Sequence, residues 1–252
     1  MQKRMQIEIC CGSLDDALSA QDVGADRIEL NSSLFLGGLT PSLGSLIAVK
    51  KHLQIPVMAM VRPRAAGFHY SPADFEVMEE DARLLIEHGA DGIVFGFLHP
   101  DGTVDTERCA RFVSLARGKE TVFHRAIDVV PDPLRALDQL IDLGITRVLT
   151  TGQKATSFEG EALIAEMVRR AADRIEILPG FNGGGITRQY ARGLIERIGV
   201  NQIHFAYLTS VPDTSTAANG QIYYGGFLYP PEDRYETADR NGMRSIIDSV
   251  RL

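Results

Sequence analysis

The feature that most limits how this chain can fold is a regular alternation of two kinds of segment. Short apolar runs rich in β-branched residues predict strands, and the segments between them carry apolar residues at helical spacing. Strands that alternate with helices form parallel βαβ units, and eight such units in about 250 residues are typical of a TIM-type (β/α)8 barrel. An open, doubly wound sheet is the alternative α/β architecture. The eight expected strands cover residues 6–11, 26–30, 56–62, 91–97, 121–126, 147–151, 175–179 and 202–206.

Turn residues support this alternation. Gly24, Gly89 and Gly144 each follow a helical segment and precede a strand, where glycine supplies the left-handed conformation that ends a helix. In the helix that Ser71 and Pro72 open, Val77 is expected to face the sheet with four other apolar residues, Ala82, Leu84, Leu85 and Ile86. The other expected helices run from Ser13 to Ala20, from a first turn that contains Pro41, and over residues 105–116, 133–143, 160–171 and 187–198.

The whole chain, residues 1–252, is expected to form a single domain. The barrel core spans about 6–206, and residues 207–252 form a C-terminal loop and a closing helix. Residues 210–231 predict a long loop over the barrel mouth or in a subunit contact, and residues 233–250 predict the helix. The aromatic stretch 223–229 is too apolar for free exposure to water, so we expect it to cover the barrel mouth or another subunit.

Composition excludes several classes of function. The chain has 26 Lys and Arg against 33 Asp and Glu, a net charge of −7, and no basic block, so nucleic acid is not an expected partner. No apolar run is long enough to span a membrane. Three cysteines without a CxxC pair argue against a disulfide framework and against structural zinc, and the cytoplasm is the expected compartment. Neither glycine-rich loop matches a nucleotide-binding motif, so no nucleotide cofactor is indicated.

Polar residues interrupt the expected strands, although parallel barrel strands usually read as continuous apolar runs. In the first strand Ile7 and Ile9 should face the helices, so Glu8 and Cys10 should face the barrel interior. The same alternation sends Glu29 and Asn31 of the second strand inward. A buried carboxylate needs a cationic or hydrogen-bonding partner, and we expect Arg62 to pair with Glu29 and to share one cavity with Glu8 and Glu29.

These residues predict a catalytic or binding cluster, because the sites of such barrels lie at the C-terminal ends of the strands. A structural ion-pair network that fixes the strand register is the alternative. His124 can shuttle protons or be a core histidine, and Asp128 can orient His124 or Arg125 or begin a turn. Which of His124 and Arg125 points inward is open. The candidate catalytic residues are Glu8, Glu29, Arg62, His124, Arg125 and Asp128.

Two further groups are candidates for binding. Arg64, together with Gly183, Gly184 and Gly185, predicts an anion site, because barrel loops and helix N-termini bind anions; ordinary turn chemistry is the alternative. Cys10 and Cys11 are candidate ligands for a soft metal such as Cu(I), although cysteine is also a common small core residue.

The motifs taken together resemble the CutC family, known as copper homeostasis proteins. The resemblance covers residues 6 to 206 in order. It is carried by Glu8-Ile9-Cys10-Cys11, Gly24-Ala25-Asp26-Arg27-Ile28-Glu29-Leu30, Gly37-Gly38-Leu39-Thr40-Pro41-Ser42, Arg62-Pro63-Arg64, Gly89-Ala90-Asp91-Gly92 with Phe95-Gly96, Phe123-His124-Arg125-Ala126 with Asp128, and Arg147-Val148-Leu149-Thr150 with Gly152-Gln153.

The resemblance implies a TIM-type barrel, a cytoplasmic homo-oligomer (dimer or tetramer) and a role in handling Cu(I). The family usually has cysteine where this chain has Asn31, which weakens a copper site built from the first two strands. Two functions therefore remain open. The first is Cu(I) binding, and the second is an isomerase, lyase or hydrolase that acts on a small anionic metabolite through the Glu, Arg and His residues.

Overall fold

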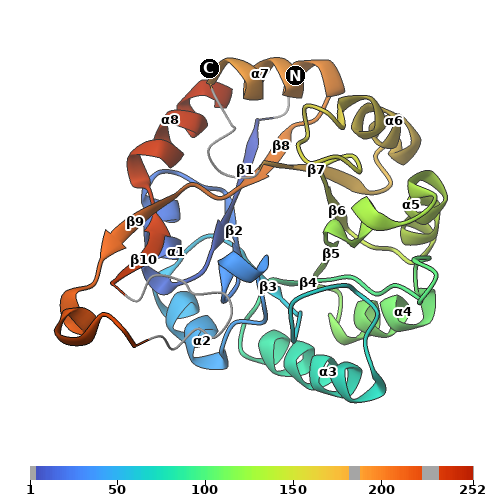
Figure 1. Ribbon diagram of the computed structural model, residues 1–252. Helices are drawn as coiled ribbons and strands as arrows, with labels where there is room; N and C mark the ends of the chain where they lie inside the picture. The colour runs from blue at the N-terminus through green and yellow to red at the C-terminus, as the bar shows by residue number, and fades with distance from the viewer. Residues whose placement is uncertain (1–3, 182–187, 223–232, 252) are drawn as a thin grey trace.

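Eight parallel strands close into a barrel, with each strand hydrogen-bonded to the next in sequence and β8 to β1. The computed structural model describes residues 4–181, 188–222 and 233–251, and Figure 1 shows the helices as an outer ring around the barrel. The predicted fold is therefore confirmed. The strands are β1 (Gln6–Cys11), β2 (Arg27–Leu30), β3 (Val57–Met60), β4 (Gly92–Phe95), β5 (Glu120–Phe123), β6 (Arg147–Thr150), β7 (Glu176–Phe181) and β8 (Gln202–Phe205).

The helices begin where short polar side chains cap them, which matches most of the expected starts. Ser71 and Asp74 form a reciprocal capping box, and Ser42 caps the helix that Pro41 was expected to join. Pro41 thus lies before that helix rather than in its first turn. The helices are α1 (Leu14–Asp22), α2 (Leu43–His52), α3 (Pro72–Glu87), α4 (Thr106–Leu115), α5 (Pro133–Asp142), α6 (Glu161–Ala171), α7 (Arg188–Ile198), α8 (Arg240–Arg251) and the short 3-10 helices η1 (Leu34–Leu36), η2 (Arg125–Val129) and η3 (Thr214–Asn219).

Alternate positions along the strands supply two separate apolar clusters. One fills the layer between sheet and helices and contains Ile7 and Ile9. The prediction for Val77 is wrong, because its side chain is 52% exposed while Met78, one position later, is buried. The second cluster lies inside the barrel and consists of Met58, Met60, Val94, Val122, Leu149 and Leu178. This inner layer forms the floor on which the polar residues of the strand ends lie.

The C-terminal segment differs from the prediction of a loop and one long helix. Residues after β8 form β9 (Leu208–Pro212), η3, and β10 (Arg234–Ala238), which pairs antiparallel with β9 beside the barrel (Figure 1). Only then does α8 begin, because the Asp239 carboxylate accepts hydrogen bonds from the backbone N–H groups of Asn241 and Gly242. The aromatic stretch 223–229 lies outside the described residues. In the described part of the chain, no helix has the length and apolar character needed to cross a membrane.

Candidate metal and ligand site

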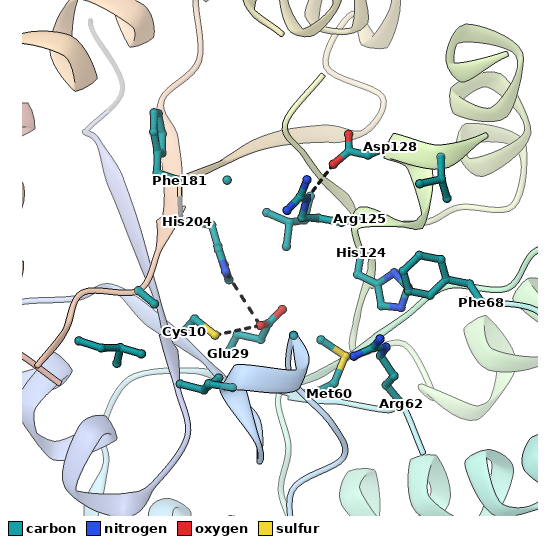
Figure 2. Close-up of a pocket in the computed structure, with 17 residues that line it drawn as sticks. Cys10, Glu29, Met60, Arg62, Phe68, His124, Arg125, Asp128, Phe181 and His204 are labelled. Atoms are coloured by element: carbon teal, nitrogen blue, oxygen red, sulfur yellow. Dashed lines mark hydrogen bonds and ion pairs between the residues drawn. The ribbon is translucent and has the colours of Figure 1, made fainter. Parts of the chain in front are cut away.

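A cavity of about 420 Å³ opens at the C-terminal ends of the barrel strands. Figure 2 shows Cys10, Glu29 and His204 on one side of it, and Arg62, Phe68 and His124 on the opposite side. The remaining lining residues are Leu34, Gly37, Met60, Arg125, Asp128, Val129, Leu149, Gly180, Phe181, Ala206 and Leu208. The cavity therefore combines mostly apolar walls with two polar sides, as ligand sites usually do.

Three side chains on the first side bring metal-binding atoms together. The Cys10 thiol donates to Glu29 Oε2 at 3.6 Å, and His204 Nε2 lies 4.0 Å from the same oxygen. One ligand atom from each of these residues lies within 4.8 Å of the other two. The Asn31 amide donates to Cys10 Sγ at 3.3 Å and to Glu29 Oε2 at 2.8 Å. Cys10, Glu29 and His204 could thus hold one ion, which we call the Cys–Glu–His cluster.

Glu8 lies beneath this cluster and does not line the cavity. Its Oε1 is 2.7 Å from His204 Nδ1, and its Oε2 accepts from Arg27 Nε. Burial alone would raise the pKa of Glu8, but Arg27 and His204 hold it well below its usual range. The predicted shared cavity is thus wrong for Glu8. The pair with Glu8 directs His204 Nε2 toward Glu29, which is how carboxylates orient metal-binding histidines.

The pKa values of the cluster follow from burial and neighbouring charge. Burial raises the pKa of Glu29, and burial together with the Glu29 carboxylate raises that of the Cys10 thiol. Burial would lower the pKa of His204, but Glu29 and Glu8 raise it. Cys10 is therefore a thiol, and a metal ion would have to displace its proton.

The two adjacent cysteines point to opposite faces of β1. Cys10 lines the cavity, whereas Cys11 is buried in the cluster between sheet and helices, and its thiol donates to the carbonyl of Ile9. Cys11 is thus not placed to bind an ion with Glu29 and His204. Because successive side chains of a strand point to opposite faces, only one of the two cysteines could face the barrel interior.

Arg62 does not pair with Glu29, so this prediction is wrong. Its Nη1 donates to the carbonyls of Leu36 and Gly38, and its Nη2 donates to that of Ala66, each at 2.9 Å. Gly38 and Ala66 have φ values of +84° and +71°, so left-handed backbone turns present these carbonyls. Arg62 joins the β2–α2 and β3–α3 connections through backbone contacts and still lines the cavity.

His124 and Arg125 both line the cavity, which answers the question of which faces inward. His124 Nδ1 accepts from the Ala126 N–H at 3.1 Å, so its proton is on Nε2, and burial and the Arg62 charge lower its pKa to about 3. Asp128 orients Arg125 rather than His124: its Oδ2 lies 2.8 Å from Arg125 Nε. It also accepts hydrogen bonds from Thr150 Oγ1 and Thr151 N.

Of the residues predicted for an anion site, the structure describes only Arg64, and Arg64 does not lie at the cavity. Arg64 pairs with Asp74 at 3.1 Å and lies over the Tyr70 ring, and it does not line the cavity. Gly183, Gly184 and Gly185 lie outside the described residues.

Sequence reasoning missed three residues around the site. His204 was not among the site candidates, and Arg27 and Arg147 were not assigned as partners of Glu8. Arg27 donates to Glu8 and Gln202, and Arg147 Nη1 lies 3.9 Å from Glu8 Oε2. The alternation that sent Glu29 inward places Arg27 on the same face, and this signal could have found it.

The fold and the site define a (β/α)8-barrel protein with a polar cluster at the strand C-terminal ends. Residues 5–209 match the model of the CutC family. The chain is 60% identical to the family protein CutC of Treponema denticola over 98% of this chain and all of that protein, and 39% identical to the human copper homeostasis protein cutC homolog over 95% and 87%. The solved CutC structure from Streptococcus agalactiae is 33% identical, with a TM-score of 0.74 over 80% of this chain and 98% of that one. The chain belongs to the CutC family.

Proposed function

We propose that this protein acts in copper homeostasis by binding Cu(I) as cargo at the Cys–Glu–His cluster. The observation that carries the proposal is the meeting of a thiol, an imidazole and a carboxylate within 4.8 Å at the end of the barrel. Thiolate and imidazole are ligands that Cu(I) accepts, and the mammalian relatives are named for copper homeostasis. Cys10 and His204 supply these donors, and Glu29 offsets the charge of the ion.

The neighbours of the cluster fit this role. Glu8 fixes the orientation of His204, so its Nε2 already points toward the cluster, and an ion would displace a proton from this nitrogen rather than turn the ring. Asn31, at the usual position of a second family cysteine, donates a hydrogen bond to Cys10 Sγ, which would stabilise a thiolate. A site with one thiolate should bind Cu(I) more weakly than a site with two.

A titration of the reduced protein with Cu(I) against a competing chelator tests the proposal. The wild type should bind one ion with a Kd below about 1 µM. Cys10→Ser and His204→Ala should lose this binding. Cys109→Ser, which changes a buried cysteine on α4 outside the cavity, is the matched control and should bind normally. Binding that is unchanged in Cys10→Ser would exclude the cluster.

The size of the cavity favours a second function, an enzyme that acts on a small organic molecule. A volume of about 420 Å³ is far larger than one ion needs, and it lies where the active sites of such barrels are found. Glu29, His124 and Arg125 line it and could take part in isomerisation, aldol-type lysis or hydrolysis. A thermal-shift screen with metabolites tests this function, because a ligand of the folded state raises the unfolding temperature.

The expected location is the cytoplasm, and the expected assembly is a homo-oligomer. The antiparallel strands β9 and β10 both have exposed residues, which suits a contact between subunits. Light scattering tests the assembly, and a monomer over the whole concentration range would contradict it.

A further inference from the structure

Two donors on the cavity side opposite the Cys–Glu–His cluster have no acceptor among the described residues. Arg62 Nε and His124 Nε2 are buried and make no hydrogen bond with the described residues. His124 Nε2 carries a proton because Nδ1 accepts from Ala126 N–H. Both side chains lie against the Phe68 ring, with the Arg62 guanidinium carbon 5.6 Å and the His124 ring centre 4.7 Å from its centre (Figure 2). Buried donors without an acceptor are costly, so an acceptor at this position would stabilise the protein.

The charge of Arg62 is also not balanced. Its side chain is buried, and three backbone carbonyls contact it, but among the described residues no carboxylate lies within ion-pair distance. The other buried arginines differ in this respect: Arg27 pairs with Glu8, and Arg147 pairs with Glu120 and Glu176. A buried cation without a counter-ion is unfavourable, so the acceptor that this position favours is an anion.

The other charged groups that line the cavity in the described part of the chain do not supply that anion. Glu29 hydrogen-bonds with Cys10 and Asn31 on the opposite side. Asp128 pairs with Arg125, and this pair neutralises its own charges. The Tyr70 hydroxyl interacts with Arg62, but burial raises the pKa of this hydroxyl, so it stays neutral and supplies no negative charge, and Tyr70 does not line the cavity.

We infer that the cavity binds a small organic carboxylate, one oxygen of which accepts hydrogen bonds from Arg62 Nε–H and His124 Nε2–H. The rest of this ligand is apolar, because Leu34, Met60 and Leu149 line the cavity with other apolar residues. The half-buried Phe68 ring lies against both donors, so the oxygen would enter between this ring and the two donors as the ring moves aside. The inference rests on the second proposed function, the small-molecule site, and does not depend on copper.

Calorimetry on metal-free protein at neutral pH tests it with two probes of nearly the same shape, phenylacetate and its neutral amide, phenylacetamide. The acid should bind about tenfold or more tightly than the amide, because hydrogen bonds to an ionised group are roughly twice as strong as neutral ones. Equal binding of the two probes would overturn the carboxylate inference and leave the small-molecule site standing. No binding of either probe at millimolar concentration would overturn both.

Three variants locate the carboxylate. Arg62→Met should remove the preference for the acid, whereas Arg64→Met, which removes an arginine two residues away that does not line the cavity, should keep it. His124→Asn keeps an acceptor for the Ala126 N–H but loses the Nε2 donor, so it should reduce the preference even if Arg62→Met fails to fold. An equal loss in Arg64→Met and Arg62→Met, or an unchanged preference in His124→Asn, would overturn the assigned position.

Discussion

Replacement of Glu8 by glutamine removes one negative charge from the most deeply buried ion-pair network of the barrel. The Glu8 carboxylate is 1% exposed and contacts two cations, since Arg27 donates to one of its oxygens and His204 lies 2.7 Å from the other. Glutamine has nearly the same shape, so it leaves no cavity. It retains one carbonyl oxygen for Arg27 but presents no anion to either neighbour.

The expected loss of stability follows from the partners that remain. Removing one member of a buried ion pair costs roughly 3–5 kcal/mol, because the other member stays buried and uncompensated. Arg27 would then keep two neutral acceptors and no anion: the carbonyl oxygen of the substituted side chain, and that of Gln202 at 2.7 Å. Arg147, the third cation, keeps Glu120 at 2.8 Å and Glu176 at 2.7 Å. We therefore expect Glu8→Gln to lower the free energy of unfolding by about 3 kcal/mol, the lower end of that range.

Urea unfolding at pH 7 measures this loss. Far-UV circular dichroism and tyrosine fluorescence serve as two probes, since the chain has no tryptophan and seven tyrosines, and coincident transitions support a two-state treatment. Glu76→Gln, an exposed change on α3, is the control. The double variant Glu8→Gln/Arg27→Met should lose less than the sum of the two single losses by about 1–3 kcal/mol. A loss below about 1 kcal/mol in Glu8→Gln, or strict additivity in the double variant, would refute this account of the network.

Three further outcomes are expected. His124 has a pKa of about 3 in the folded protein against an ordinary value of 6.5, so the folded state disfavours its protonation. The free energy of unfolding should therefore be unaffected by His124 above pH 6.5 and should fall as the pH falls toward 3, by about 2 kcal/mol at pH 5. In urea unfolding, His124→Asn should show a smaller pH dependence than the wild type. Gly152→Ala should destabilise by roughly 2 kcal/mol or more, because φ is +71° and a Cβ would lie 2.3 Å from the Gly160 carbonyl oxygen; a thermal unfolding temperature equal to wild type would contradict this. Arg64→Ala should cost less than about 1 kcal/mol in urea unfolding, because its pair with Asp74 and its hydrogen bonds to the Gly67 and His69 carbonyls are partly exposed; a larger loss would mean that its contact with the Tyr70 ring stabilises the fold more than such exposed contacts do.

The barrel could be predicted because its strands and helices follow strict periodicities. Ile7 and Ile9 had to face the helix layer, so Glu8 and Cys10 had to face inward, and the structure agrees. The β9–β10 hairpin could not be predicted in this way. Its strands have no continuously buried face, so its sequence lacks the alternation that identifies a half-buried strand.

The alternation of a strand predicts which charged side chains face inward, but it does not predict which of them lie close enough to pair. Arg62 was expected beside Glu29 because β2 and β3 are neighbours. Instead, the left-handed turns at Gly38 and Ala66 place backbone carbonyls against its guanidinium, which donates to them rather than to Glu29. His204 is adjacent to Glu8 only because β8 closes the barrel against β1, with the two residues paired in register. The contact between Glu8 and His204 joins residues 196 positions apart, so no local sequence pattern could predict it.

The two polar sides of the cavity differ in their hydrogen bonding, and this difference allows the two proposed functions to be tested separately. At the Cys–Glu–His cluster the thiol, the Asn31 amide and Glu29 Oε2 hydrogen-bond to one another, so an ion at these atoms would replace existing hydrogen bonds and release the Cys10 proton. On the opposite side Arg62 and His124 present donors and a charge without acceptors, so an anion would add contacts and displace none that the described residues make. Copper binding should therefore weaken as the pH falls, through competition with the proton for Cys10. Carboxylate binding should not depend on Cys10 at all. A Cys10→Ser variant that loses Cu(I) but retains phenylacetate would establish two independent sites within one cavity, whereas loss of both would mean that they form one.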